Sequence, residues 1–265
     1  MFRPLRPLGA LLPAGPWPDN ARLNTLAESR GQPVNAAGTR VRFVPHPTGP
    51  RSVENGFEPR CFFKGEVQVR AADWHDLFNA LVWMTFPATK ARINALHMEN
   101  FPGEAGGRRS PLRDALTMFD EDGAAVFSSD PALLQMVREF RWKELFWNAR
   151  QRVKTSMCFL IFGHALFQKS LRPFVGMTAK AILLPVPQSF MALPSHTQVS
   201  QADARLAAVL ADHKVWKSGR DLSPLPVLGV PGWWAENERE DFYDNRDYFR
   251  PGRRAMRNQA VRSSR

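Results

Sequence analysis

Apolar residues recur every three or four positions in the middle of the chain, a spacing typical of helices with a buried face. The clearest case covers residues 74–85, where the repeating apolar residues are Leu77, Phe78, Leu81 and Val82. Asp73 directly precedes this run and can accept hydrogen bonds from the first amides of a helix. Pro87 suits the first turn of a second helix that reaches about Met98. We therefore expect two consecutive, largely buried helices.

A serine or aspartate before each of three further runs predicts a helix start, because its side chain can cap the first amides. These start residues are Ser110, Asp130 and Ser200. The helices that they predict cover residues 112–119, 131–140 and 201–212. Another helix is expected over 21–30, and the acidic run 120–123 is expected to form a turn. Over 141–169 we expect a helix that breaks near 154–156 and continues as a buried helix.

Strands are expected to be few and short. Weak alternation or short apolar runs favour strands at 40–44, 60–69 and 124–127. The pattern as a whole predicts an irregular, mainly α-helical, multi-helix protein with a single globular domain over 21–250. Residues 1–20 are expected to form a flexible, proline-rich extension. The C-terminal end should also be extended, with a proline-rich segment and then a disordered basic tail over 251–265.

Positive charge is concentrated at the C-terminal end of the chain. Lys and Arg number 36 and Asp and Glu number 25, which gives a net charge of +11 over 265 residues. Residues 249–265 contain no acid and six arginines: Arg250, Arg253, Arg254, Arg257, Arg262 and Arg265. Such a segment attracts RNA and other polyanions with little sequence preference, or it serves as a solvated end that aids solubility. The sequence leaves both interpretations open.

Composition and cysteine content narrow the class of protein. An apolar content of 44% excludes an acidic disordered chain, and the sequence is neither collagen-like nor a small disulfide-held domain. The two cysteines, Cys61 and Cys158, have no metal-binding spacing and fit a reducing compartment. The longest apolar run, 157–167, is too short to span a bilayer. We therefore expect a cytoplasmic protein without a membrane span.

No complete catalytic motif is present, because the chain lacks a nucleophile elbow, a phosphate-binding loop, a dinucleotide fingerprint and a zinc-binding pattern. Polar residues nevertheless recur at the edges of apolar helices. His75 and Asn79 share one helix face, with Asp76 beside them. His75 fits a general base or a metal ligand. The structural alternative makes Asp76 a capping carboxylate and the other two hydrogen-bonded residues under a loop.

A second polar group follows Ser110. Arg113 and Asp114 can position a substrate or form a structural ion pair, and Thr117 shares a helix face with Asp114. Asp120 begins an acidic run that resembles a fragment of a calcium-binding loop. The full ligand spacing is missing, so an ordinary acidic turn is the stronger interpretation of this run.

Two charged or titratable residues stand inside apolar segments. His164 lies in the run 159–167, where a buried imidazole must find partners or stay neutral, and such a residue is more often part of the core. Lys180 binds an anion, or extends its amine to solvent. His75, Asp120 and His164 would supply two imidazoles and a carboxylate for a divalent metal if the fold brings them together.

Several of these segments match the motifs of a known family. They include residues 74–83 (WHDLFNALVW), 85–87 with Lys90, 113–117 (RDALT), 162–166 (FGHAL) and 176–181 (GMTAKA). With these motifs the chain resembles the bacterial family called domain of unknown function 3025 over about residues 21–254. The resemblance supplies motif positions and implies no reaction, cofactor or catalytic residue.

The sequence therefore predicts a hydrolase-like or metal-assisted enzyme that acts on a small or anionic substrate. The predicted catalytic residues are His75, Asp76, Asp114 and His164. The predicted substrate-binding residues are Asn79, Arg113, Thr117 and Lys180, and Asp120 joins His75 and His164 in the metal set. The alternative is a non-catalytic RNA- or polyanion-binding protein that uses Arg250, Arg253, Arg254 and Arg257.

Overall fold

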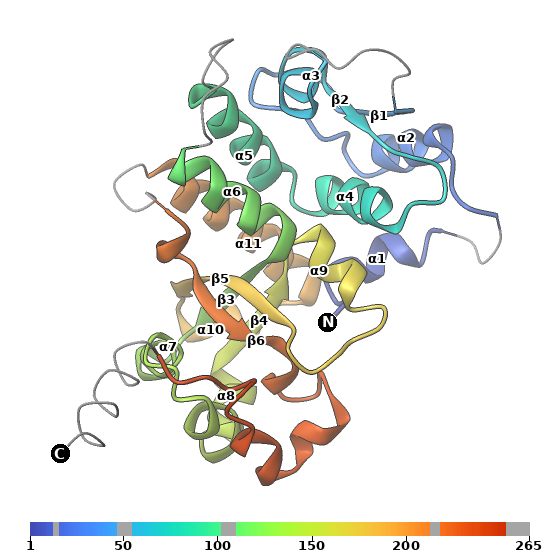
Figure 1. Ribbon diagram of the computed structural model, residues 1–265. Coiled ribbons are helices and arrows are strands. Elements are labelled where there is room, and N and C mark those ends of the chain that lie inside the picture. Colours follow the sequence, from blue (N-terminus) through green and yellow to red (C-terminus); the bar gives the residue numbers. More distant parts are fainter. Residues whose placement is uncertain (13–15, 47–54, 102–109, 213–217, 253–265) are drawn as a thin grey trace. The chain divides into compact units, whose positions relative to one another are not determined.

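The computed structural model describes residues 1–12, 16–46, 55–101, 110–212 and 218–252, and most of its regular structure is helical (Figure 1). The mainly α-helical class expected from the sequence is confirmed. The chain divides into two compact units. Unit 1 comprises Met1–Gly123, Leu160–Leu171 and Pro194–Leu222, and unit 2 comprises Ala124–Phe159, Arg172–Leu193 and Ser223–Arg265. The single domain expected over 21–250 stays a prediction, since two compact units of one chain can also fold as one domain.

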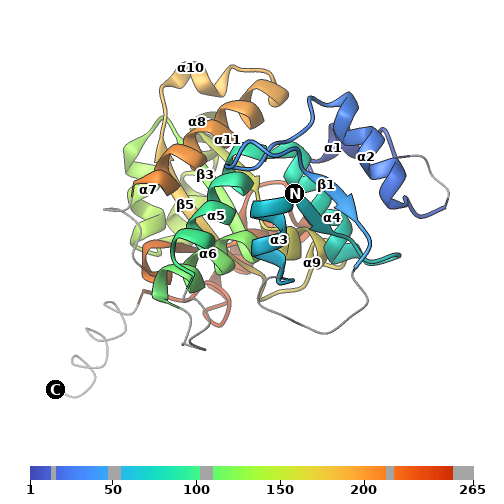
Figure 2. The same cartoon turned by 90° about the horizontal axis from the view of Figure 1, so that it is seen from above.

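Unit 1 consists of helices and one pair of short strands. Its helices are α1 (Arg6–Gly9), α2 (Asn20–Ser29), α3 (Phe57–Lys64), α4 (Trp74–Thr85), α5 (Pro87–Glu99), α6 (Pro111–Asp122), α9 (His164–Lys169), α11 (Ser195–Ala211) and the 3₁₀ turn η2 (Gly219–Asp221). Strands β1 (Arg42–Val44) and β2 (Glu66–Gln68) pair in parallel. Helix α5 packs against both α6 and α11, and α4 packs against α9 (Figures 1 and 2).

Helices α4 and α5 confirm the two consecutive buried helices expected from the sequence. The Asp73 side chain accepts a hydrogen bond from the Asp76 amide at 3.1 Å and so caps α4. Helix α5 starts with a proline and has no capping side chain of its own. Asp203 of α11 accepts hydrogen bonds from the amides of Ala88 and Thr89 at 3.0 and 2.8 Å. An aspartate from another helix thus satisfies the first amides of α5.

The turn expected at 120–123 is wrong, because α6 continues through Asp122 and strand β3 follows directly. Acidic side chains in the last turn of a helix are repelled by the negative end of its dipole. Here Lys90 binds Asp120 and Lys169 binds Asp122, each through its amine. The two lysines offset the repulsion, which allows the helix to continue.

Most residues of a four-stranded sheet with the order β4-β3-β5-β6 belong to unit 2. The strands are β3 (Gly123–Ser128), β4 (Met157–Ile161), β5 (Thr178–Pro185) and β6 (Ser223–Pro226). Strands β5 and β6 are antiparallel, with Ala179 opposite Leu225. Its other elements are α7 (Pro131–Arg138), the π-helical turn η1 (Glu144–Asn148), α8 (Arg150–Ser156), α10 (Gln188–Met191) and the 3₁₀ turns η3 (Val227–Gly229), η4 (Ala235–Glu238) and η5 (Glu240–Asp244).

The apolar run after residue 156 begins as strand β4 and not as the expected buried helix. A short apolar run carries no periodicity that separates a buried strand from a buried helix. Helix α9 starts only at His164, directly after Gly163. A Cβ atom at Gly163 would collide with the carbonyl oxygen of Glu121. Glycine therefore allows the start of α9 to lie against the end of α6.

Two other predicted elements differ in type or start. Helix α3 occupies the first part of the strand expected over 60–69, and Gly65, with a φ of 67°, ends it before β2. Helix α11 begins at Ser195, so Ser200 lies inside the helix and is not its cap. In both cases a proline or glycine near the helix end marks the boundary better than the apolar pattern does.

Part of the expected N-terminal extension packs against unit 1. Leu5 and Leu8 are buried at 3% exposure. The ring of Phe2 lies 5.9 Å from that of Phe78 on α4 and 5.8 Å from that of Phe167 on α9. Every helix among the described residues is too short or too polar to cross a bilayer.

Candidate functional site

Unit 1 contains a cavity of about 540 Å³, a volume in the range of small-molecule sites. Side chains from α3, α4, α5, α6 and α9 line it. It gathers these residues that the sequence analysis selects: His75, Asp76, Asn79, Arg113, Thr117, Asp120 and His164. Polar side chains from separate stretches of the chain therefore share one cavity.

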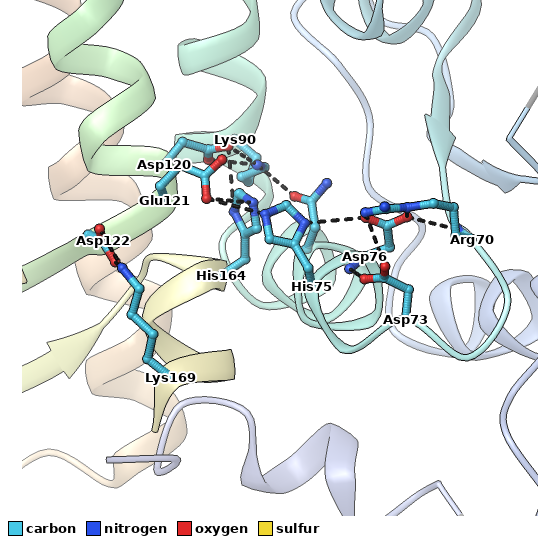
Figure 3. Close-up of polar contacts among 11 residues, drawn as sticks. Arg70, Asp73, His75, Asp76, Lys90, Asp120, Glu121, Asp122, His164 and Lys169 are labelled. Atoms are coloured by element: carbon cyan, nitrogen blue, oxygen red, sulfur yellow. Dashed lines mark hydrogen bonds and ion pairs between the residues drawn. The ribbon is translucent and has the colours of Figure 1, made fainter. Parts of the chain in front are cut away.

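Two histidines and a glutamate meet in this cavity (Figure 3). Nε2 of His75 lies 3.2 Å from Oε2 of Glu121, and Nε2 of His164 lies 3.6 Å from the same oxygen. The two imidazole rings are edge to face, with centroids 4.4 Å apart. One ligand atom from each residue lies within 4.8 Å of the other two. Imidazole and carboxylate donors at this spacing can hold a divalent metal ion.

Asp76 holds His75 from the side opposite Glu121 (Figure 3). Oδ1 of Asp76 lies 3.3 Å from Nδ1 of His75, and Arg70 donates to both Asp76 oxygens at 2.7 and 2.8 Å. Hydrogen bonds with Asp76 and Glu121 raise the pKa of His75 to about 9. Burial opposes the ionisation of Asp76, but hydrogen bonds from Arg70 and His75 hold its pKa well below the ordinary value.

His164 has a different environment although its ring touches that of His75. Its side chain is 4% exposed, and this burial lowers its pKa to about 4. Nδ1 of His164 faces Oδ2 of Asp120 at 3.7 Å. His164 is therefore a neutral imidazole at neutral pH, the form that binds metals.

A buried lysine holds Asp120 in place. The amine of Lys90 lies 2.6 and 2.8 Å from the two Asp120 oxygens and 2.8 Å from Oδ1 of Asn79. Burial opposes the ionisation of Asp120, but the charge of Lys90 keeps its pKa below the ordinary value. The Lys90 side chain is 2% exposed, so this ion pair is structural and leaves Asp120 less available to a metal.

A fourth carboxyl group of the cavity, that of Glu58, lies beside α5. Oε2 of Glu58 accepts a hydrogen bond from Nδ2 of Asn94 at 2.6 Å, and Oε1 lies 3.8 Å from Nε2 of His97. Burial raises the pKa of Glu58 to about 7, although the hydrogen bond from Asn94 acts in the opposite direction. Both Glu58 and His97 line the cavity.

Asp73, His75 and Asp76 also place ligand atoms close together. The Arg70 guanidinium binds both aspartates, with its Nη2 3.2 Å from Oδ2 of Asp73. A cation is thus already bound by these carboxylates, so this group is the weaker metal candidate.

Three of the predicted site residues lie outside the group that His75, Glu121 and His164 form. Asp114 is exposed and does not line the cavity, because it lies on the outer face of α6. Lys180 belongs to β5 of unit 2 and does not line the cavity either. The carboxylate beside both histidine Nε2 atoms is Glu121 and not Asp120, whose two oxygens are held by Lys90.

The residues that the sequence analysis missed are Glu121, Lys90, Arg70, Glu58 and His97. A signal for Glu121 was present, since Arg113, Thr117 and Glu121 are spaced four residues apart and share one helix face. The sequence analysis ends this helix before residue 120, which places Glu121 in a turn and not on the same helix face. The partners of Lys90 and Glu58 come from other helices, so no local pattern points to them.

The basic tail is only partly within the described residues. Arg250 is exposed, and its Nε donates to the Asp247 carbonyl at 2.9 Å. Arg253, Arg254 and Arg257 lie outside the described residues. Binding of RNA or another polyanion by these arginines therefore stays a prediction.

Comparison with known proteins identifies one family. The family model described as "Protein of unknown function (DUF3025)" matches residues 41–253, which confirms the resemblance seen in the motifs. No curated protein and no solved structure matches the chain. The match includes every residue of the cavity described above.

Proposed function

The chain belongs to the DUF3025 family, and for it we propose a metal-assisted hydrolase of anionic substrates in which His75, Glu121 and His164 hold a divalent metal ion. The proposal depends above all on one observation, the spacing of the three ligand atoms. In a tetrahedral site with bonds of about 2.0–2.2 Å, ligand atoms lie about 3.3–3.6 Å apart. Oε2 of Glu121 lies 3.2 and 3.6 Å from the two imidazole nitrogens. The side chains need little movement to accept a metal.

The surroundings of His75 support the same conclusion. A histidine that binds a metal usually has a carboxylate or carbonyl beside its other ring nitrogen, which fixes the orientation of the ring. Asp76 lies 3.3 Å from Nδ1 of His75, within hydrogen-bond distance. Nδ1 of His164 is buried and makes no hydrogen bond among the described residues, and Oδ2 of Asp120 lies 3.7 Å from it. Both Nε2 atoms face Glu121.

Three protein ligands are typical of catalytic metal sites, which keep a position open for water or substrate. The side chains of His75 and Glu121 are 33% and 39% exposed, so the metal position is accessible from the cavity. A divalent ion lowers the pKa of bound water toward neutrality and polarises a carbonyl or phosphoryl group. In hydrolysis the water oxygen bonds to the carbon or phosphorus, the bond to the leaving group breaks, and the leaving group takes the proton from the water.

Metal titration of the full-length chain tests the proposal. Protein freed of metal with EDTA is titrated with Co²⁺ and Zn²⁺ in a calorimeter, and the visible spectrum of the Co²⁺ form reports coordination. We expect one ion per chain. His164→Ala and Glu121→Gln should each weaken binding by more than the ~10–100-fold typical of losing an outer partner. His196→Ala and Glu28→Gln, which change exposed residues of α11 and α2, are the matched controls.

Hydrolysis is measured with p-nitrophenyl phosphate and p-nitrophenyl acetate, with and without added metal. Metal-dependent release of p-nitrophenolate that His164→Ala abolishes would support the proposal. If the wild-type chain binds no metal, or if His164→Ala and Glu121→Gln bind it as the wild type does, the proposed function is wrong.

The cytoplasmic location expected from the cysteine content stays a prediction. Cys61 and Cys158 are both buried and form no disulfide among the described residues. Buried cysteines without a disulfide are compatible with a reducing compartment, which supports this location.

A further inference from the structure

Helix α6 presents a row of polar side chains to the cavity. Arg113, Thr117 and Glu121 follow one another at intervals of four residues, and all three line the cavity. Side chains at this interval lie on one face of a helix, one above the other. With a rise of 1.5 Å per residue, Arg113 and Glu121 are about 12 Å apart along the helix axis. One helix therefore carries a cationic group two turns away from the proposed metal ligand.

The guanidinium of Arg113 packs over an aromatic ring. Its central carbon lies 5.1 Å from the centre of the Phe101 ring, and both residues line the cavity. Arg113 as a whole is 8% exposed, so its long side chain is confined. Stacking on an aromatic ring covers one face of a guanidinium, whereas its N–H donors lie in the plane and point outward from the edge. This geometry suits the two oxygens of a carboxylate or phosphate.

Two further cations bind carboxylates of the metal end. Arg70 donates to Asp76, and Lys90 donates to Asp120. Each of these carboxylates lies beside the Nδ1 atom of a metal-binding histidine candidate. Arg70 and Lys90 are thus positioning residues for the metal end, and Arg113 is at the other end of the row on α6.

We propose that Arg113 binds a carboxylate or phosphate group of a small-molecule substrate whose hydrolysed bond lies at the His75–Glu121–His164 group. This inference rests on the proposed function and specifies its substrate class. The substrate carries its oxyanion at the Arg113 end of the row on α6, and the bond that is cleaved lies at the Glu121 end. A cavity of about 540 Å³ encloses a metabolite-sized molecule, so small acids fit this site and folded polymers do not.

Anion binding by the full-length chain tests this inference with inorganic phosphate and acetate as probes. Both anions are titrated into metal-free protein and followed by calorimetry and by NMR shifts of backbone amides. We expect binding without metal, and we expect Arg113→Met to weaken it about ten- to a hundredfold, because a charge-assisted pair of hydrogen bonds is lost. Arg113→Lys should recover only part of the affinity, since an ammonium cannot bind two oxygens in one plane.

Arg205→Met is the matched control, because it removes an exposed arginine from α11 of the same unit and should leave anion binding unchanged. Circular dichroism and Co²⁺ titration show whether each variant is folded and still binds metal. Anion affinity equal to the wild type in a folded Arg113→Met variant would overturn the inference. So would a wild-type chain that binds neither probe, or that binds them only with metal present. In each of these cases the Co²⁺ titration still decides separately whether the proposed metal site exists.

Discussion

At the scale of single residues, His75 and His164 touch edge to face, yet their surroundings favour opposite protonation states. Hydrogen bonds with Asp76 and Glu121 stabilise the imidazolium of His75 and raise its pKa to about 9. Burial excludes water from His164 and lowers its pKa to about 4. One imidazole is thus ready to bind a metal at neutral pH, and the other must first release a proton. The carboxylates beside His75 are therefore as important to the site as the ring itself.

The first prediction concerns Asp76. Asp76→Asn keeps the shape of the side chain but removes the negative charge beside Nδ1 of His75, at 3.3 Å. The ring is then less firmly oriented and its Nε2 is a weaker ligand, so Co²⁺ affinity measured by calorimetry should fall about 10–100-fold. Asp114→Asn makes the same change on the exposed face of α6 and should have no effect. Equal affinity in wild type and Asp76→Asn would argue against His75 as a ligand.

The second prediction concerns the pH dependence of stability at Glu58. Its pKa is raised from 4.5 to about 7, so the folded state binds a proton at this carboxyl more tightly than the unfolded chain does. The stabilisation is fully present below about pH 4.5 and is lost as the pH rises to about 7. Each pKa unit is worth about 1.4 kcal/mol of stability, and solvent screening reduces this value for a side chain that is 24% exposed. The protonated Glu58 side chain should therefore contribute on the order of 2 kcal/mol to the free energy of unfolding.

Glu58→Gln removes the titrating group but keeps an oxygen for Asn94. In urea unfolding experiments, the variant should therefore gain stability relative to the wild type between about pH 5 and about pH 8. Glu28→Gln, an exposed substitution on α2, controls for the general effect of charge. A wild-type minus variant difference that does not change over this pH range would show that Glu58 is ionised throughout.

Residue-level prediction from the sequence succeeds where the determining contacts are local. His75, Asp76 and Asn79 follow from one helix with a recognisable cap, and all three line the cavity. The choice between Asp120 and Glu121 depends on where α6 ends and on a lysine of another helix. Neither fact is contained in the local pattern, which explains why the neighbouring acid was selected.

At the scale of elements, the last turn of α6 carries a concentration of negative charge that the helix dipole opposes. Two lysines from other helices bind these acidic side chains (Figure 3). The two lysines differ in burial. Lys90 from α5 is 2% exposed, whereas Lys169 from α9 is 43% exposed. The buried pair therefore fixes α5 against α6, and the exposed pair adds little.

The third prediction compares these two lysines. Lys90→Met leaves the buried charge of Asp120 without its amine and should lower the free energy of unfolding by about 3–5 kcal/mol. Lys169→Met breaks the exposed pair with Asp122 and should cost only about 0–1 kcal/mol. The double variant Lys90→Met/Asp120→Asn should recover part of the loss, because no uncompensated charge remains. Equal effects of the two single variants in urea unfolding would contradict the structural role given to Lys90.

A helix with a capping residue and a periodic apolar face is predictable from the sequence, as α4 demonstrates. The proline at the start of α5 makes the beginning of that helix predictable as well. The strand β4 is not, because five consecutive apolar residues fit a buried strand as well as a helix turn. The beginning of α9 depends on the close contact of Gly163 with Glu121, which is a tertiary contact. His164, which the sequence analysis selects, is the first residue of α9, so this tertiary contact also sets where His164 lies.

At the scale of the whole molecule, the residues of the site come from stretches of the chain that are distant in sequence. Unit 1 takes its residues from Met1–Gly123, Leu160–Leu171 and Pro194–Leu222, and His164 reaches the site from the second of these. Sequence analysis can select polar positions in each stretch but cannot show that they meet. The charged tail, by contrast, follows from composition alone, because its effect on polyanions needs no fold.

The fourth prediction separates this tail from the metal site. Residues 253–265 contain five arginines and no acid and account for nearly half of the net charge of +11. Without these residues, the chain should elute from immobilised heparin at lower salt. The association constant for a nucleic acid should also depend less steeply on salt. On a log–log plot its slope is about −0.7 to −0.9 for each phosphate that the protein neutralises. Co²⁺ affinity should not change, because the ligands all belong to unit 1.

A full-length variant in which the same five arginines are glutamines distinguishes charge from chain length. Counterion release depends on the number of cationic groups that contact the polyanion, so this variant should behave like the truncated chain. If the glutamine variant instead elutes with the wild type, the tail does not carry polyanion binding. The remaining positive charge of residues 1–252 would then account for any retention on heparin. Polyanion binding and the proposed hydrolase site would in that case both belong to residues 1–252.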